Sequence, residues 1–222
     1  MCKRALQLLC TIAVRTTALA PSFDTFSAAA TGSWTGTQYK WPGDSDGVAC
    51  TAVVNEVMRS CGGAVQGVRV GDGPLLNRQD DGFCFFNCGS WTQGPTKIAD
   101  GIVHLNVGLV AQSGSRVRST ASISAGHVVD ATVVVEEKAG ATPLAKRESL
   151  AAAGSPWLAP RLKWTRSTEA TTLPDDAVAL PGGVSIACVD KNGATDVVVR
   201  ADDVSLTRSY DASGQLVEIR LV

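Results

Sequence analysis

The stretch TGSWTGTQYKWPGDSDG, residues 31–47, sets the fold class. A Gly-x-Trp pair, Gly32 and Trp34, opens a run that alternates as a β-strand does. The run ends in Gly-Asp-Ser-Asp-Gly, the composition of a polar hairpin turn. A strand followed at once by such a turn predicts antiparallel β-structure from residue 32 onward.

The rest of the chain repeats this pattern of short strands and turns. IVHLNVGLV, residues 102–110, places four apolar side chains on one face and His104 and Asn106 on the other. SLTRSY and QLVEIRLV, joined by Asp-Ala-Ser-Gly, predict a closing hairpin. The one helix candidate, VACTAVVNEVMRS, is equally compatible with a strand because Val and Thr dominate it. Many short strands with Gly-rich or Asp-rich breaks predict one all-β sandwich or barrel.

Composition excludes two classes of partner. The chain has 222 residues, 45% of them hydrophobic, which is enough for a sizeable core. Its net charge of -1 provides no basic stripe, so we expect no nucleic-acid partner. No apolar run reaches the roughly 18 to 20 residues of a membrane span, so we expect no transmembrane segment in the mature chain.

The N-terminal residues have the layout of a targeting sequence. Lys3 and Arg4 precede the apolar run ALQLLCTIAV, and small residues follow, as in a secretory signal over residues 1–20. Residues 21–31 are rich in Ser, Thr and Ala and are expected to be a transit or linker segment. The signal followed by Ala-Pro-x-Phe resembles the bipartite presequence of algal plastid proteins. The expected location is the plastid, with secretion as the alternative. Residues 32–222 are expected to form a single domain.

The cysteines fit no disulfide framework. Without the presequence an odd number remains: Cys50, Cys61, Cys84, Cys88 and Cys188. On one strand Cys84 and Cys88 would lie about 13 Å apart, whereas the Cα atoms of a disulfide lie within about 7 Å. A bridge from Cys50 to Cys61 stays open. No Cys-x-x-Cys pair and only two histidines are present, so no metal site is expected.

Three features resemble the lipocalin or calycin superfamily. They are GSWTGTQYKWPGDSDG at the start, LPGGVSIACV late in the chain, and the closing RSYDASG. More specifically, they are similar to a poorly characterised branch from cyanobacteria and plastids related to the phycobiliprotein (bilin) lyases. The resemblance implies an antiparallel up-and-down β-barrel with at most one or two short helices. It also implies that Gly32 and Trp34 close one end of the barrel and that Arg208 packs across the indole, a cation–π arrangement.

A barrel of about eight strands encloses room for one small hydrophobic ligand. Bilins, other tetrapyrroles, carotenoids and lipids are the candidates. Arg116 and Arg118, on one strand face, are candidates to bind propionate groups; the alternative is a solvated outer face. The candidate lining is aromatic, with ordinary core packing as the alternative, and consists of Phe83, Phe85, Trp91 and Trp164.

Two kinds of active site are disfavoured. Ser45 matches Gly-x-Ser-x-Gly, but the nucleophile elbow needs a buried strand before it, and Lys-Trp-Pro stands there. No catalytic residue is therefore assigned. Haem-binding barrels that begin Gly-x-Trp-x-Gly need an axial histidine from a late strand, and no histidine follows His127. His104 and His127 are expected to be exposed or hydrogen-bonded structural residues.

Three functions remain. The first is a barrel that binds a small pigment or lipid in the plastid. The second is an enzyme similar to the bilin lyases that attaches a chromophore to a protein. The third is a ligand-free barrel that acts as an assembly factor or accessory subunit of a photosynthetic complex.

Overall fold

The computed structural model of the chain describes residues 23–43, 49–61, 67–70, 75–77, 82–86, 88–99, 101–111, 114–139, 163–166, 171–202 and 204–222. One short helix, α1 (Phe23–Ala30), precedes a succession of strands. All pairings between neighbouring strands in this described part are antiparallel except that of β10 with β15. The expectation of an all-β protein with at most one or two short helices is confirmed for the described residues.

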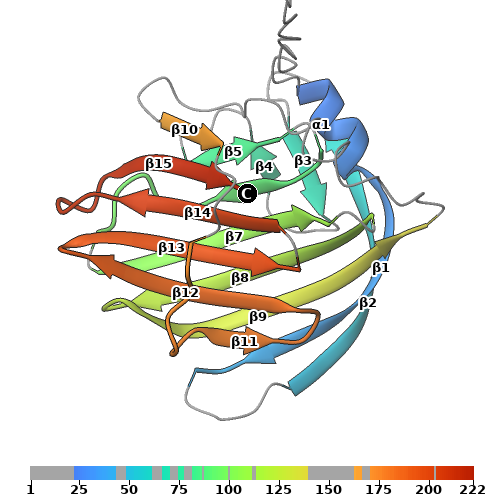
Figure 1. Cartoon of the computed structure of the whole chain (residues 1–222). Coiled ribbons are helices and arrows are strands. Elements are labelled where there is room, and N and C mark those ends of the chain that lie inside the picture. Colours follow the sequence, from blue (N-terminus) through green and yellow to red (C-terminus); the bar gives the residue numbers. More distant parts are fainter. Residues whose placement is uncertain are drawn as a thin grey trace, which may run out of the picture.

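The larger sheet has nine strands in the order β4-β3-β2-β1-β9-β8-β7-β6-β5 (Figure 1). The strand expected at residue 32 pairs on one side with the next strand and on the other with β9, which lies far along the sequence. The bounds are β1 Gly32–Trp41, β2 Ala49–Cys61, β3 Gly67–Val70, β4 Leu75–Asn77, β5 Phe83–Phe85, β6 Trp91–Gln93, β7 Ile102–Val110, β8 Ser115–Ser124 and β9 His127–Lys138.

The smaller sheet has six strands in the order β10-β15-β14-β13-β12-β11. The predicted closing hairpin is present as β14 and β15. The bounds are β10 Lys163–Arg166, β11 Val178–Leu180, β12 Val184–Lys191, β13 Ala194–Ala201, β14 Val204–Tyr210 and β15 Leu216–Leu221.

The main core lies between the two sheets. The four apolar residues predicted to share a face of β7, Val103, Leu105, Val107 and Leu109, are all buried in it. Alternate residues of β8 and β9 join them, and side chains from β12 to β15 pack from the other side. We call this the outer face of the nine-stranded sheet, and the opposite face, which carries His104 and Asn106, the inner face.

The nine-stranded sheet curls around its inner face. Leu76 is on one edge strand, β4, and Phe83 and Phe85 are on the other, β5, yet all three belong to one buried cluster. The edges can share a cluster only if the sheet bends toward the inner face. We call this the aromatic cluster; its members are Phe23, Phe26, Ala30, Trp34, Leu76, Phe83, Phe85 and Trp91.

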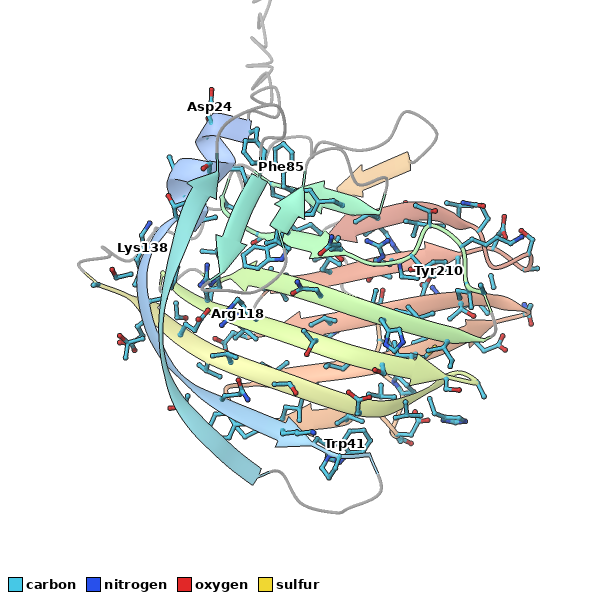
Figure 2. The ribbon with its side chains drawn as sticks, turned by 180° about the vertical axis from the view of Figure 1, so that it is seen from behind. Asp24, Trp41, Phe85, Arg118, Lys138 and Tyr210 are labelled. Atoms are coloured by element: carbon cyan, nitrogen blue, oxygen red, sulfur yellow. The ribbon has the colours of Figure 1, made fainter. Side chains whose placement is uncertain are left out.

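The helix α1 covers one end of the inner face. Figure 2 shows it above Phe85, with Trp41 at the opposite end of the molecule. Phe26 is fully buried, and its ring centroid lies 5.0 Å from that of Phe85 and 6.4 Å from that of Trp91. Residues 21–31 were expected to be a transit or linker segment. In the structure most of this segment is a helix packed into the domain, because both of its phenylalanines point into the aromatic cluster.

Two further expectations meet the structure here. The ambiguous stretch VACTAVVNEVMRS is a strand, since β2 spans Ala49–Cys61. The strands form two open sheets in place of one up-and-down barrel. The late strands, which would belong to a single barrel, pair with one another instead.

Within the described residues, no helix has the length and apolar character needed to cross a membrane. The signal-like residues 1–20 and the turn containing Ser45 lie outside the described residues.

Candidate functional site

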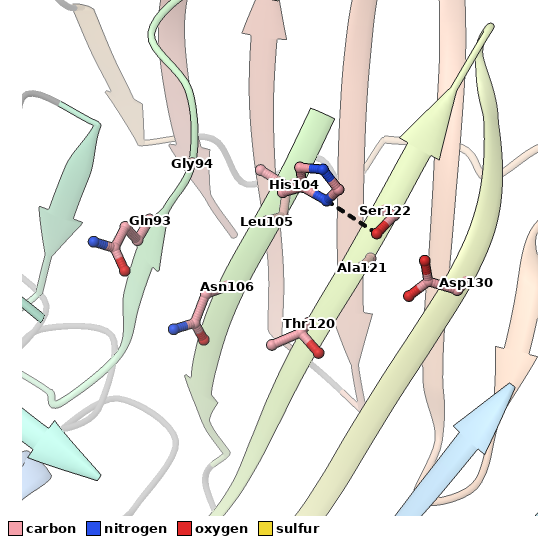
Figure 3. Close-up of a pocket in the computed structure, with 9 residues that line it drawn as sticks. All are labelled: Gln93, Gly94, His104, Leu105, Asn106, Thr120, Ala121, Ser122 and Asp130. Atoms are coloured by element: carbon pink, nitrogen blue, oxygen red, sulfur yellow. Dashed lines mark hydrogen bonds between the residues drawn. The ribbon is translucent and has the colours of Figure 1, made fainter. Parts of the chain in front are cut away.

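A hollow of about 360 Å³ lies on the inner face (Figure 3). Neighbouring strands β6, β7, β8 and β9 line it, and most of the side chains that point into it are polar. It is open to solvent, since His104 and Thr120 are exposed. The lining residues are Gln93, Gly94, His104, Leu105, Asn106, Thr120, Ala121, Ser122 and Asp130.

Strand register brings these polar residues together in two rows. His104 on β7 stands opposite Ser122 on β8, which in turn stands opposite Asp130 on β9. The next row joins Asn106 to Thr120. Because side chains alternate between faces, residues two apart on each strand point the same way, and neighbouring strands lie about 4.8 Å apart. The alternation of the three strands therefore builds the polar surface, and the apolar residues between them enter the core.

The hydrogen bond drawn in Figure 3 joins the His104 Nδ1 and the Ser122 hydroxyl at 3.0 Å. His104 is also exposed, so the expectation of an exposed or hydrogen-bonded histidine is confirmed. Asp130 supplies a carboxylate to the same row. This set offers acceptors, amide and hydroxyl donors and one acid to a ligand. Alternation placed His104 and Asn106 on one face, but Thr120, Ser122 and Asp130 were missed. The alternation of SRVRSTASIS carried the signal for Thr120 and Ser122.

The two arginines predicted to bind propionates both bind the chain's own carboxylate. Arg116 Nε lies 2.8 Å from Glu136 Oε2, and Arg118 donates to both Glu136 oxygens at 3.0 and 3.1 Å. Arg116 and Glu136 have fully buried side chains, whereas 17% of the Arg118 side chain is exposed. All three lie on the inner face: Arg116 contacts α1 through the Ala30 carbonyl oxygen, and Arg118 is two residues before Thr120 of the hollow on β8. The prediction that the arginines share a strand face is confirmed; their role toward a ligand stays a prediction.

The arginine that covers Trp34 is Arg116, and the expectation that Arg208 does so is wrong. The Arg116 guanidinium carbon lies 3.8 Å from the centroid of the Trp34 ring and 5.4 Å from that of Trp91. Arg208 belongs to the other sheet. Its guanidinium donates to the carbonyl oxygens of Gly82, Gly94 and Pro95 and so fastens the two sheets together.

The aromatic candidates are brought together but are packed. Phe83, Phe85 and Trp91 are buried in the aromatic cluster beside Trp34, with Phe26 of α1 among them. Trp164 is on β10, and its side chain lies outside the described part of the chain. Three of the four candidates thus share one place with Arg116, and the helix fills the space that a ligand would need.

The remaining residues considered from the sequence are the cysteines and His127. Cys84, Cys88 and Cys188 are free thiols. No disulfide joins Cys84 to Cys88, as expected, although only Cys84 is on a strand, β5. The side chains of Cys50 and Cys61 lie outside the described residues. His127 is exposed, 3.7 Å from Asp176. In the part of the chain that the structure describes, no three His, Cys, Asp or Glu side chains gather as metal ligands would.

Comparison with known proteins adds a likeness to solved structures. No protein-family model matches the chain, and no curated protein matches it. Among solved structures, it is similar to the crystal structure of a protein of unknown function from the DUF3598 family of Nostoc punctiforme PCC 73102. The sequence identity is 14% and the TM-score 0.48, and the match covers 91% of this chain and 98% of that one. Function has to be inferred from the side chains of the chain itself.

Proposed function

We propose that the protein binds a small molecule with hydrogen-bonding groups in the hollow on the inner face. The observation that carries the proposal is a cavity of about 360 Å³ lined by polar side chains from adjacent strands. Ligand pockets in proteins are concave, with volumes from about 300 Å³ upward and a few placed polar groups. The hollow is at the lower end of this range, so it suits a compact ligand or one end of a longer one.

The lining selects among the ligand classes. A carotenoid or the tail of a fatty acid would remove His104, Asn106 and Asp130 from water without offering them hydrogen bonds, which costs free energy for each group. A ligand with N–H donors or a positive charge satisfies the Asp130 carboxylate. A tetrapyrrole has such donors in its pyrrole rings, so among the pigments and lipids the proposal favours a bilin or another tetrapyrrole.

We also propose a relation to calycin barrels and a place in the plastid. The meeting of the two edge strands of the nine-stranded sheet in the aromatic cluster supports a barrel-like shape around the inner face. The signal-like layout of residues 1–20 and the Ala-Pro-x-Phe stretch at residues 20–23 support the location. A fusion of these residues to a fluorescent protein, expressed in an alga with secondary plastids, tests the location directly.

The binding experiment uses the chain from residue 21, incubated with an algal pigment and lipid extract and washed. Retained molecules are measured by absorbance and by mass spectrometry after solvent extraction. We expect one retained compound near one per chain. We expect its loss in Thr120→Trp, because an indole at this exposed position of the lining would fill the hollow.

The control is Ser33→Trp, which places the same bulk on an exposed residue of β1 outside the hollow. It should retain the compound as the parent chain does. Equal retention by both variants would place the compound elsewhere, and a chain that retains nothing would overturn the proposal in favour of a ligand-free role in a protein complex.

A further inference from the structure

We infer that α1 occupies a second binding site, one that takes an aromatic carboxylate when the helix leaves it. The site lies on the inner face beyond the hollow, beneath α1, and the inference does not depend on the proposed function. Three observations carry it: the side chains that the helix covers, the donors that meet its last carbonyl groups, and the charge that gathers there.

The helix covers flat aromatic surfaces from three strands. Trp34, Phe83, Phe85 and Trp91 are each at most 2% exposed, and Phe26 lies among them. The Phe26 ring packs edge-on to Phe83 and Trp91, with centroid distances of 6.1 and 6.4 Å. This is the geometry that an aromatic guest adopts between aromatic walls. The Phe26 side chain therefore holds the position that the ring of a ligand would hold.

Three donors converge on the C-terminal end of α1. Trp34 Nε1 and Arg116 Nη1 donate to the Ala30 carbonyl oxygen at 3.1 and 3.3 Å. Lys138 Nζ donates to the Ala29 carbonyl oxygen at 3.1 Å. A helix carries partial negative charge at this end. A carboxylate carries a full charge and makes stronger bonds to the same cationic donors, so it can replace the helix end.

The charge around these donors favours an anion. Among the described side chains on this part of the inner face, Arg116, Arg118 and Lys138 are opposed by Glu136. Burial, and then the positive charge of Arg116, lower the pKa of Lys138. The two cations that contact the helix end thus repel each other, and a bound carboxylate relieves that repulsion. The ligand class that fits is a ring system of aromatic character with a carboxylate at one end.

The competition between helix and ligand makes a measurable prediction. The apparent affinity of a ligand scales with the fraction of molecules whose site is open. Phe26→Asp puts a charge among the aromatic rings and undocks the helix. Thr25→Asp makes the same change on an exposed residue of the same helix. We expect Phe26→Asp to bind 2-naphthoate at least tenfold more tightly than Thr25→Asp, measured by calorimetry on the chain from residue 21.

A neutral analogue identifies the role of the donors. The affinity of Phe26→Asp for 2-naphthoate should be about tenfold or more higher than its affinity for 2-naphthylmethanol, because a hydrogen bond to a charged group contributes that much. Lys138→Met in the same background should remove most of this preference. Thr120→Trp, which fills the hollow, should leave naphthoate affinity unchanged. A loss of naphthoate binding in Thr120→Trp would place the probe in the hollow and overturn the inference.

If Phe26→Asp does not fold, hydrogen exchange in the unaltered chain tests the inference. Saturating 2-naphthoate should speed hydrogen exchange of the amides at residues 27–31, because the helix has left its place. Slower or unchanged exchange at these amides would show that the helix stays docked, and equal naphthoate affinity in the two aspartate variants would show the same. Either result overturns the inference.

Discussion

The guanidinium of Arg116 lies 3.8 Å above the Trp34 ring while its Nε binds Glu136 at 2.8 Å. Both ion-pair partners have fully buried side chains. A buried ion pair adds little to stability compared with apolar residues, but removing one partner leaves the other charge buried and uncompensated. The pair therefore stabilises the domain only while both residues are present.

Loss of Arg116 should be costly. Arg116→Met leaves Glu136 buried with one of its two arginines and removes the cation from Trp34, so we expect a loss of about 3–5 kcal/mol in the free energy of unfolding. Urea denaturation followed by tryptophan fluorescence measures it. Asp176→Asn removes one partner of an exposed pair, 3.7 Å from His127, and should cost about 1 kcal/mol or less. Equal losses in the two variants would contradict this account of the buried pair.

The helix α1 should contribute to stability. Phe26→Ala removes a fully buried ring that contacts Phe83, Phe85 and Trp91, and such truncations cost about 3–5 kcal/mol. Thr25→Ala, on the exposed side of the helix, should change stability by no more than about 0.5 kcal/mol. Thermal unfolding should likewise show that a chain starting at residue 32 melts well below one starting at residue 21. Equal melting temperatures would mean that the helix is dispensable.

Gly36 should tolerate no side chain. It pairs with Glu136 across β1 and β9, and a Cβ atom there would collide with the Val135 carbonyl oxygen and come within 2.9 Å of the Glu136 Cα. Backbone atoms cannot move aside as a flexible side chain would. We expect Gly36→Ala to cost about 1–3 kcal/mol, the range for overpacking, in chemical denaturation. Ser33→Ala, at an exposed position of the same strand, is the control and should be close to neutral.

Cys188 should react only at high pH. Burial, and then the charges of Asp190, Asp176 and Asp196, raise its pKa from 9.0 to about 11. The thiolate is the reactive form, so at pH 8 the population of thiolate is about a hundredfold below that of an ordinary thiol. In a chain with Cys2, Cys10, Cys50 and Cys61 changed to Ser, the rate of reaction with Ellman's reagent should still rise about tenfold between pH 9 and pH 10.

The other two thiols provide the comparison. Burial raises the pKa of Cys84 and of Cys88, and both lie in or beside the core between the sheets. They should stay unreactive until the chain is unfolded in urea, when all three react alike. A fast native reaction of Cys84 or Cys88 near pH 8 would show that this part of the core opens.

The sequence predicted which segments are strands and which residues share a face, but it predicted less well which residues of distant strands lie side by side. The faces of residues 102–110 follow from alternation alone, and the structure confirms them. The partner of Trp34 could not be found in this way. Arg116 reaches Trp34 because β9 pairs with both β1 and β8, and such pairing between distant segments leaves no local signal. The resemblance implied that Arg208 lies there, but Arg208 is on β14 in the six-stranded sheet.

Two misses have different physical causes. Phe23 and Phe26 were assigned to a transit or linker segment because Ser, Thr and Ala surround them, whereas burial of their rings packs α1 into the domain. The hollow was missed because its residues lie on four strands with no motif of their own. Only the register of His104 with Ser122, and of Ser122 with Asp130, brings them together.

The pairing of β1 with β9 has a consequence for the synthesis of the chain. Trp34 and Lys138 are register partners although roughly a hundred residues separate them. During translation β1 emerges early and has to wait for β9 with one row of backbone N–H and C=O groups unpaired. Contacts this distant in sequence form slowly, and an unpaired strand edge invites association with other chains. Chaperones that hold nascent strands apart should therefore raise the yield of the folded protein more than they change its stability.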